Sequence, residues 1–337
     1  MGRHKAEEVD QEEVTEPKTN SIPVPPVDVS ALVEAVRGRY GKKQSGLAKD
    51  LSTGDKIILS DDLDDYVVSN EVKFWKPLTG IIGIPYGRIV QIAGKPDSGK
   101  TTTAMAFMKA AQEAGTLVIL WDSERKFSAK RYKNSIGGDP SSILIVSSNS
   151  ITEGAKQVSW YIKGAKEQNP DVKILVVWDS VGATLNTKED IDDEASDDYD
   201  KQPGVTAKQV SWAIKKLNAL IYRYRNEENG KHTVAVCCVN QVYANIGSVG
   251  STEKGGTELY YLSSIILNLS RKKDLNRVRG GQKIKYGIVT RAKVKKNHLF
   301  DGEDCIAELD LVVSSDGIKL EQEVRDKVGI VGWDSED

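Results

Sequence analysis

The sequence has few cysteines, no excess of charge of one sign and no long apolar run. Its three cysteines, Cys237, Cys238 and Cys305, lack the spacing of a metal site or a disulfide framework. Neither a signal-peptide pattern nor an apolar stretch of about 18 residues is present, which argues against secretion and membrane insertion. We therefore expect a protein of a reducing cytoplasm with no membrane partner.

The sequence also lacks an excess of positive or of negative charge. The 47 Lys and Arg residues and 49 Asp and Glu residues give a formal net charge of −2. Such a chain cannot hold nucleic acid by overall attraction, so any contact of that kind must come from local patches. Apolar residues make up 39% of the chain, which suits a globular fold with a substantial core.

The most informative stretch, 94–101, fits the pattern G-x-x-x-x-G-K-[ST] of a phosphate-binding loop. An apolar run precedes it and good helix formers follow it, which is the strand–turn–helix context that this loop requires. The helix N-terminus adds a positive partial charge beneath the phosphates. Lys100 is expected to reach the β- and γ-phosphates and the Thr101 hydroxyl to hold Mg²⁺. The predicted nucleotide contacts are Gly94, Lys95, Pro96, Asp97, Ser98, Gly99, Lys100, Thr101 and Thr102.

From residue 74 onward, strand and helix patterns alternate, which is typical of an α/β fold with a mostly parallel sheet. Thr206 is placed to cap the last of the predicted helices. Later strands, separated by turn signals, are expected to be antiparallel. The predicted strands are 88–93, 116–121, 143–147, 173–178 and 233–239, then 262–269, 284–291 and 306–313; the predicted helices are 101–114, 152–168 and 207–226.

The chain is predicted to divide into four parts. Residues 1–29 indicate a disordered tail and a Pro-rich linker. Residues 30–73 contain a short helix, capped by Ser30, that packs on its own chain or on a neighbouring subunit in an oligomer. Residues 74–320 form the core, and 321–337 form a short tail that frays.

Two strand ends supply candidate acids for nucleotide chemistry. Asp179 ends a buried β run and is the expected carboxylate for Mg²⁺ on a neighbouring strand. Asp122 and Glu124 follow the strand after the phosphate-loop helix. Because parallel strands bind ligands beyond their carboxyl ends, either acid can serve as the general base that activates water.

Several motifs, in order, resemble bacterial RecA recombinases over roughly residues 75–315. They are 83–94, the D-x-E strand end at 121–124, V-N-Q at 239–241, G-G-x-x-L at 255–259 and R-A-K-V-K-K-N-H at 291–298. The resemblance implies a RecA-like ATPase core that uses ATP and Mg²⁺. It selects Glu124 as the residue that activates water, and it implies that Gln241 senses the γ-phosphate and relays it to a DNA-binding loop.

The resemblance also implies further nucleotide contacts and shows departures. Ser128 and Arg131 lie where the family contacts the base. Lys296 and His298 fall on positions that act on a neighbour's ATP, although the family has a lysine where His298 stands. The chain ends soon after the core, which is closer to phage recombinases of the UvsX kind.

Two segments are candidates for facing DNA. The loop 242–256 follows Gln241, and its glycines, amides, Tyr243 and Lys254 suit phosphates and bases. The other segment, 185–205, is harder to assign, because 189–200 holds eight acids in twelve residues and repels phosphate. The basic run 271–283 is either a patch for duplex DNA or a solvated turn. The predicted DNA contacts are Tyr243, Asn245, Ile246, Gly247, Lys254, Gly255 and Gly256, with Lys201 and Lys208.

The sequence thus predicts a DNA-dependent ATPase that forms helical filaments on single-stranded DNA and exchanges strands with homologous duplex, in a bacterial or phage-infected cytoplasm. Two alternatives share the phosphate loop and stay open. One is another RecA-fold motor, such as a hexameric helicase or a repair loader. The other is a nucleotide-gated scaffold without turnover.

Overall fold

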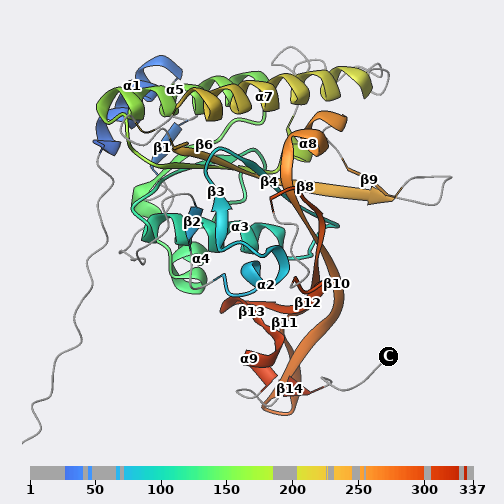
Figure 1. Cartoon of the computed structure of the whole chain (residues 1–337). Helices are drawn as coiled ribbons and strands as arrows, with labels where there is room; N and C mark the ends of the chain where they lie inside the picture. Colours follow the sequence, from blue (N-terminus) through green and yellow to red (C-terminus); the bar gives the residue numbers. More distant parts are fainter. Residues whose placement is uncertain are drawn as a thin grey trace, which may run out of the picture.

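The computed structural model describes residues 27–40, 45–47, 66–68, 72–184, 203–224, 226, 231–244, 251–253, 256–299, 305–325 and 330–331. Within these ranges a large mixed sheet forms the centre of the molecule (Figure 1). Its strands, in spatial order, are β1 (Ser45–Leu47), β6 (Ile143–Val146), β5 (Leu117–Asp122), β7 (Ile174–Asp179), β8 (Val234–Ala244), β4 (Ile89–Gly94), β10 (Ser263–Arg279), β11 (Gln282–Asn297), β12 (Glu308–Ser314) and β13 (Gly317–Leu320).

The sheet is parallel at its centre and antiparallel at its edges. The strands from β6 through β5, β7, β8 and β4 to β10 pair in parallel. Strand β1 at one edge and β11, β12 and β13 at the other are antiparallel to their neighbours. The predicted α/β fold class, a RecA-like core with antiparallel edge strands, is confirmed.

One predicted orientation is wrong. The segment 262–269, expected to be antiparallel, forms the start of β10 and runs parallel to β4, while it is antiparallel only to β11. The reason is the connection that precedes it, because the chain leaves β8 and returns through helix α8 (Gly256–Leu262) before it enters the sheet. A crossover of this kind brings the new strand in from the same end as its neighbour.

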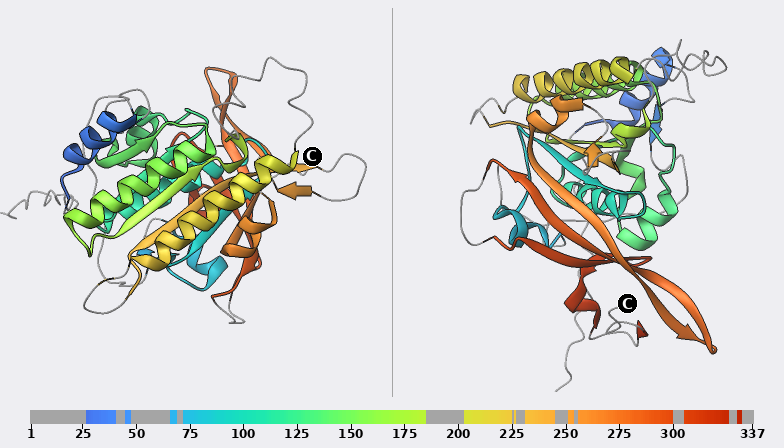
Figure 2. Two further views of the ribbon diagram at one scale, coloured as in Figure 1. Left: turned by 90° about the horizontal axis from the view of Figure 1, so that it is seen from above. Right: turned by 90° about the vertical axis from the view of Figure 1, so that its right-hand side faces the viewer.

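Helices cover both faces of the sheet (Figure 2). The helices α1 (Val29–Tyr40), α5 (Ile151–Gln168) and α7 (Pro203–Arg223) lie on one face, and their apolar side chains join a core cluster with β5 and β7. On the other face, α2 (Trp75–Thr79) and α3 (Lys100–Glu113) pack in a second cluster. The apolar stripe of α7 is buried as predicted, at Val210, Ile214, Leu217 and Ile221.

Two predicted helix caps are wrong. Helix α7 begins at Pro203, so Thr206 lies inside the helix. Proline suits this start because the first helical N–H needs no partner within the helix. Helix α1 begins at Val29, and it is the Asp28 carboxylate that accepts the N–H of Ala31 at 3.0 Å, where Ser30 was expected to cap.

Helix α1 packs on its own chain in this structure, which is one of the two packings expected for it. Val36 is fully buried and Leu32 is 3% exposed. A Cβ at Gly164 of α5 would lie 2.7 Å from Leu32, so the glycine lets the two helices approach closely. The backbone N–H of Asp28 also donates to the Gln168 side chain at 2.7 Å.

The β10–β11 pair forms a long hairpin that projects from the body of the molecule (Figure 2). It continues well past the apolar segments that predicted it, and turns at Gly280 and Gly281, whose φ angles are 61° and 79°. The basic stretch 271–283 is therefore part of a paired ribbon. Leu275 and Tyr286 pack in a small cluster at its base.

Several short strands and a short helix are attached to this core. Strand β9 (Ser251–Glu253) pairs with β8, β14 (Ile330–Val331) pairs with β10, and β2 (Tyr66–Val68) pairs with β3 (Gly83–Pro85). The first residues of the tail that was expected to fray form helix α9 (Glu321–Arg325). This helix buries Val324, and its Glu323 forms an ion pair with Lys73 at 2.6 Å. In the described part of the chain, every helix is too short or too polar to span a membrane.

Candidate functional site

The predicted site residues converge at the carboxyl edge of the parallel strands. In the sheet register, Asp122 lies opposite Asp179, and Gly94 lies opposite Gln241. Strand β8 stands between β4 and β7, so Gln241 is on the immediate neighbour of the phosphate-loop strand. Asp179 ends β7, and β8 separates β7 from the phosphate-loop strand β4. The expected position on a neighbouring strand is therefore wrong, but Asp179 does lie at the expected edge of the sheet.

The loop 94–101 is held in a conformation that needs its glycines. A Cβ at Gly94 would lie 2.3 Å from the Leu269 carbonyl oxygen, and one at Gly99 would lie 2.8 Å from Val313. Gly99 has a φ of 92°, which L residues rarely adopt. On the β11 side, the Thr290 hydroxyl donates to the Ser98 carbonyl at 2.9 Å. The neighbouring strands therefore hold the loop in place before any ligand arrives.

Lys100 lies against this loop. Its ammonium donates to the Lys95 carbonyl at 2.6 Å. Burial lowers the pKa of Lys100, and the carboxylates of Asp179, Glu124 and Asp97 partly oppose that shift. The Lys100 ammonium therefore lies beside the loop, where a bound phosphate could replace the Lys95 carbonyl as its partner.

Thr101 and Asp179 bring two oxygen ligands together. Burial raises the pKa of Asp179 to about 6, the Thr101 side chain opposes this rise, and Glu124 and Asp122 add to it. No group of three or more His, Cys, Asp or Glu in the described residues is arranged to hold a metal ion. Mg²⁺ commonly uses few protein ligands together with phosphate oxygens and water, so this hydroxyl–carboxylate pair fits it.

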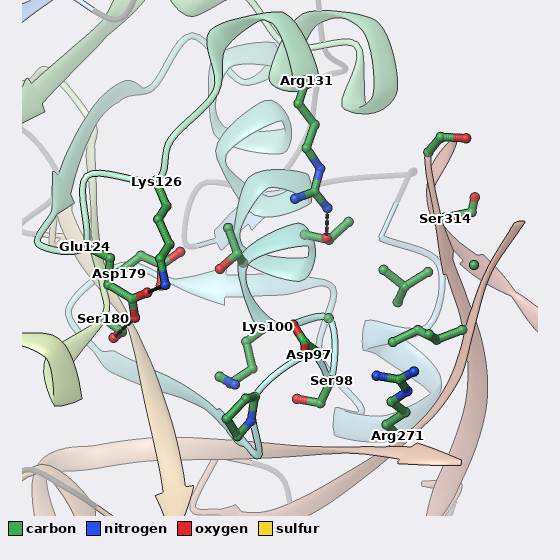
Figure 3. A pocket seen from close by; sticks show the side chains of 18 of the residues that line it. Asp97, Ser98, Lys100, Glu124, Lys126, Arg131, Asp179, Ser180, Arg271 and Ser314 are labelled. Carbon is green, nitrogen blue, oxygen red and sulfur yellow. Dashed lines mark hydrogen bonds and ion pairs between the residues drawn. The ribbon is translucent and has the colours of Figure 1, made fainter. Parts of the chain in front are cut away.

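Glu124 is the centre of a polar cluster (Figure 3). Its carboxylate accepts Lys126 Nζ at 2.5 Å, Ser180 Oγ at 2.6 Å and Gln241 Nε2 at 3.1 Å. Burial acts to raise the pKa of Glu124, but the hydrogen bonds from these three side chains outweigh it and hold the pKa below its usual value. Sequence patterning did not indicate Lys126 or Ser180, because neither belongs to a motif defined by spacing.

Asp122 makes different contacts from Glu124. Its two carboxylate oxygens accept the backbone N–H groups of Lys126 at 3.1 Å and Phe127 at 2.9 Å, which fixes the turn that follows β5. Burial raises the pKa of Asp122. The donors to Asp122 are backbone N–H groups fixed in the turn, whereas the donors to Glu124 are side chains, of which Lys126 is largely exposed and can move away. Glu124 is therefore the better placed of the two acids.

A cavity of about 720 Å³ lies between the phosphate loop and the β10–β12 strands, within the range of small-molecule sites. Glu124, Asp179 and Gln241 line one side. The opposite side includes Arg271, from the run that the sequence left between a DNA patch and a turn, and Ser314 (Figure 3).

One of the two predicted base-contacting residues, Arg131, lies at the rim of this cavity. Arg131, on the short helix α4 (Ala129–Arg131), donates to the Thr102 hydroxyl at 2.6 Å and lines the cavity. The Ser128 side chain caps the same helix by accepting the Arg131 N–H at 3.2 Å. Ser128 is not among the residues that line the cavity.

Lys296 and His298 are not part of their own chain's cavity. Through β10, Lys296 is level with Gln91, in the amino-terminal half of β4 and away from the phosphate loop. Its ammonium donates to the carbonyls of Tyr260 at 2.7 Å and Tyr261 at 3.1 Å. The His298 side chain is exposed.

The expected DNA-facing loop begins later than predicted. Strand β8 continues to Ala244, and Tyr243 pairs with Thr252 of β9, so Tyr243 lies in a ribbon. Gly256 starts α8, and Lys208 is exposed on α7. Outside the described residues lie Asn245, Ile246, Gly247, Lys254, Gly255, Lys201 and the acidic run 189–200.

Comparison with known proteins agrees with this geometry. Residues 58–319 match the family model of the RecA N-terminal domain. The chain is 34% identical over 261 residues to the protein RecA of Bartonella bacilliformis, covering 75% of this chain and 67% of that protein. It is 30% identical over 284 residues to RecA of Nautilia profundicola, covering 82% and 74%, and 30% identical over 233 residues to RecA of Rippkaea orientalis, covering 68% and 60%.

The matched region spans 60% to 63% of the length of several of these relatives, such as the RecA proteins of Rippkaea orientalis and Mesoplasma florum. The family model, in contrast, covers well over half of the present chain and includes every element that lines the cavity. The phosphate loop, the Glu124 cluster and the Gln241 strand all fall within it. The chain therefore belongs to the RecA family.

Proposed function

We propose that the chain is an ATP-dependent DNA recombinase that polymerises on single-stranded DNA and catalyses homologous pairing and strand exchange with duplex DNA. The observation that carries the proposal is the 3.1 Å hydrogen bond from Gln241 to Glu124. Gln241 lies opposite the first glycine of the phosphate loop, and its strand runs directly into the segment 242–256. One side chain thus links the nucleotide site to the candidate DNA loop.

The phosphate loop supports binding of ATP with Mg²⁺. Lys100 would neutralise the β- and γ-phosphates, and Thr101 and Asp179 would hold the metal ion. When bound, Mg²⁺ draws charge from the phosphate oxygens and makes the γ-phosphorus easier to attack. The raised pKa of Asp179, about 6, reflects desolvation that outweighs the opposing effects of Thr101 and the Lys100 ammonium.

Glu124 would accept the proton of the attacking water. The low pKa of Glu124 keeps it ionised at neutral pH, and the hydrogen bonds from Ser180 and Gln241 orient its carboxylate. Lys126 also binds this carboxylate, and 76% of the Lys126 side chain is exposed. Its ammonium can therefore move into solvent and free an oxygen for water.

Contacts to the base and to a neighbouring subunit complete the proposed site. The planar Arg131 guanidinium, held beside Thr102, can stack on adenine, with Ser128 positioning its helix. Lys296 and His298 lie away from their own phosphate loop, so they can reach only the nucleotide of another subunit. Such heterologous contacts build helical filaments, and the segment 30–73 would add to them.

Single-stranded DNA would bind along the segment 242–256 and the start of α7. Tyr243 can wedge between bases, and Lys201, Lys208 and Lys254 can hold phosphates. A cytoplasmic setting, bacterial or phage-infected, and a kinship with recombinases of the UvsX kind complete the proposal.

A strand-exchange assay with Lys100→Ala beside the wild type tests the proposal. The wild type should convert circular single strands and linear duplex to joint molecules with ATP, and the variant should not. Electron microscopy on single-stranded DNA with a slowly hydrolysed ATP analogue should show helical filaments. Closed rings and no joint molecules from the wild type would contradict the proposal and favour a helicase.

A further inference from the structure

Helices α5 and α7 carry the same sequence on adjacent positions of one layer. The six residues 155–160 and 207–212 both read A-K-Q-V-S-W, and isoleucine and lysine follow at the same spacing in each. The helices contact each other along their length and lie side by side (Figure 2). In both, the valine and the isoleucine are buried against the sheet, at Val158 and Ile162 and at Val210 and Ile214. Because the same positions are buried, the two helices present the same kinds of side chain on their outer faces.

The two copies of the tryptophan have different surroundings. Trp160 of α5 is partly buried, and the Arg39 guanidinium of α1 lies 5.8 Å from its ring centroid. Trp212 of α7 is 42% exposed. The ammonium of Lys216, from the same helix, lies over the Trp212 ring, at 5.0 Å from the centroid. In the described part of the chain, α1 covers the α5 copy while the α7 copy stays open to solvent.

Lysines gather near the open tryptophan, and one of them, Lys215, has an acidic partner, Glu258 of α8, at 3.2 Å. Lys156 and Lys163 are exposed on α5, and among the described residues neither these two nor Lys216 forms an ion pair. Lys216 lies over the Trp212 ring on a helix that contacts α5, and burial, with repulsion from Lys163 and Lys156 of α5, lowers the pKa of Lys216. Helix α7 contains no Asp or Glu at all. Unpaired cations beside an exposed aromatic ring form an open site for a polyanion with flat groups.

We propose that this α5–α7 face, made of Lys156, Lys163, Trp212 and Lys216, binds single-stranded nucleic acid, with a base stacked on Trp212 and phosphates on the lysines. None of these four residues lines the nucleotide cavity, so binding at this face is expected without ATP. The inference rests on the proposed function for the class of polymer, and it extends the DNA-binding surface from the start of α7 onto α5.

Salt dependence of binding tests the phosphate contacts. Affinity of the full chain for a fluorescein-labelled oligo(dT) is measured by anisotropy, without nucleotide, from low to high NaCl. Lys156→Gln with Lys163→Gln should reduce the slope of log K against log salt by about 1.4, since each phosphate contact on a single strand contributes about 0.7. Lys76→Gln with Lys319→Gln removes two exposed lysines from α2 and β13 and should leave the slope unchanged.

Substitution of the ring tests the stacking contact. Trp212→Ala should weaken binding about tenfold at one salt concentration, and Trp212→Phe should keep most of the affinity. Because Trp212 is exposed, thermal melts should show the wild-type fold in both variants.

Two results would overturn the inference. In one, the lysine pair and Trp212→Ala bind the oligonucleotide with the slope and affinity of the wild type. In the other, the oligonucleotide is unaffected but a synthetic peptide of residues 189–200 loses its binding in the lysine variant, which would make the face a site for acidic peptide. Either result leaves the proposed recombinase activity intact, since Lys100→Ala decides that separately.

Discussion

The carboxyl edge of the sheet and the α5–α7 face both gather charge, but they do so in opposite ways. At the edge, the Glu124 carboxylate has three donors and Lys100 has a carbonyl partner within the same chain. On the α5–α7 face, Lys156 and Lys163 have no partner among the described residues. The first region is organised before a small ligand arrives, whereas the second presents mobile charges to an extended ligand. Substitutions at the edge should therefore change catalysis, and those on the face should change salt-dependent affinity.

The largest effect is expected from Glu124→Gln. The amide keeps the size of the side chain but cannot accept a proton from water, so ATP turnover should fall by about 10²- to 10⁴-fold. Nucleotide affinity, measured with a fluorescent analogue, should change only a few-fold. Unchanged turnover that was already negligible in the wild type would instead support a nucleotide-gated scaffold.

An intermediate effect is expected from Arg131→Gln. Loss of the planar guanidinium beside Thr102 should raise KM for ATP about tenfold and leave kcat nearly unchanged. Arg131→Lys is the matched control, because it keeps the charge without the planar group. If the lysine variant restores the wild-type KM, charge and not stacking holds the nucleotide at this rim.

The smallest effect is on stability, through Asp179→Asn. Since the pKa of Asp179 is raised to about 6 in the folded protein, the folded state binds a proton more tightly than the unfolded chain. This contribution to stability is present at low pH and is lost as pH rises toward and through 6. The variant, without nucleotide, should therefore be more stable than the wild type by about 1–3 kcal/mol at pH 8.

Thermal melts at pH 8 and pH 5 check this stability prediction. At pH 5 the difference between variant and wild type should shrink, because the wild-type carboxyl is then largely protonated. A variant that is less stable at both pH values would mean that the Thr101 contact, and not desolvation, dominates at Asp179. Stabilisation by ATP and Mg²⁺ should be lost in the variant at either pH.

The parallel centre of the fold is predictable from the sequence because local and global signals agree there. The run 88–93 is largely apolar, and a glycine-containing turn and a run of good helix formers follow it. The ends of β4 and α3 therefore lie within one residue of the predicted ends. The strand pattern also predicted the edge at which Asp179 lies, since Asp179 ends a buried run, whereas Gln241 was identified through the resemblance.

Features that depend on neighbours in space were not predictable. The β10–β11 hairpin continues through polar residues such as Asn276 because pairing, and not an apolar face, holds it. The choice between Asp122 and Glu124 rests on which oxygens the backbone N–H groups of the following turn occupy. The uncovered state of Trp212 depends on where α1 packs, which no local pattern reveals.

The central claim is that Gln241 couples the nucleotide to DNA binding, and affinity for single-stranded DNA in two nucleotide states tests it most directly. Oligo(dT) binding is measured for the wild type and Gln241→Ala, each with a slowly hydrolysed ATP analogue and with ADP. The wild type should bind more tightly with the analogue by a factor of about ten or more, and the variant should bind equally in both states while still binding nucleotide. A variant that keeps the wild-type ratio would contradict the account.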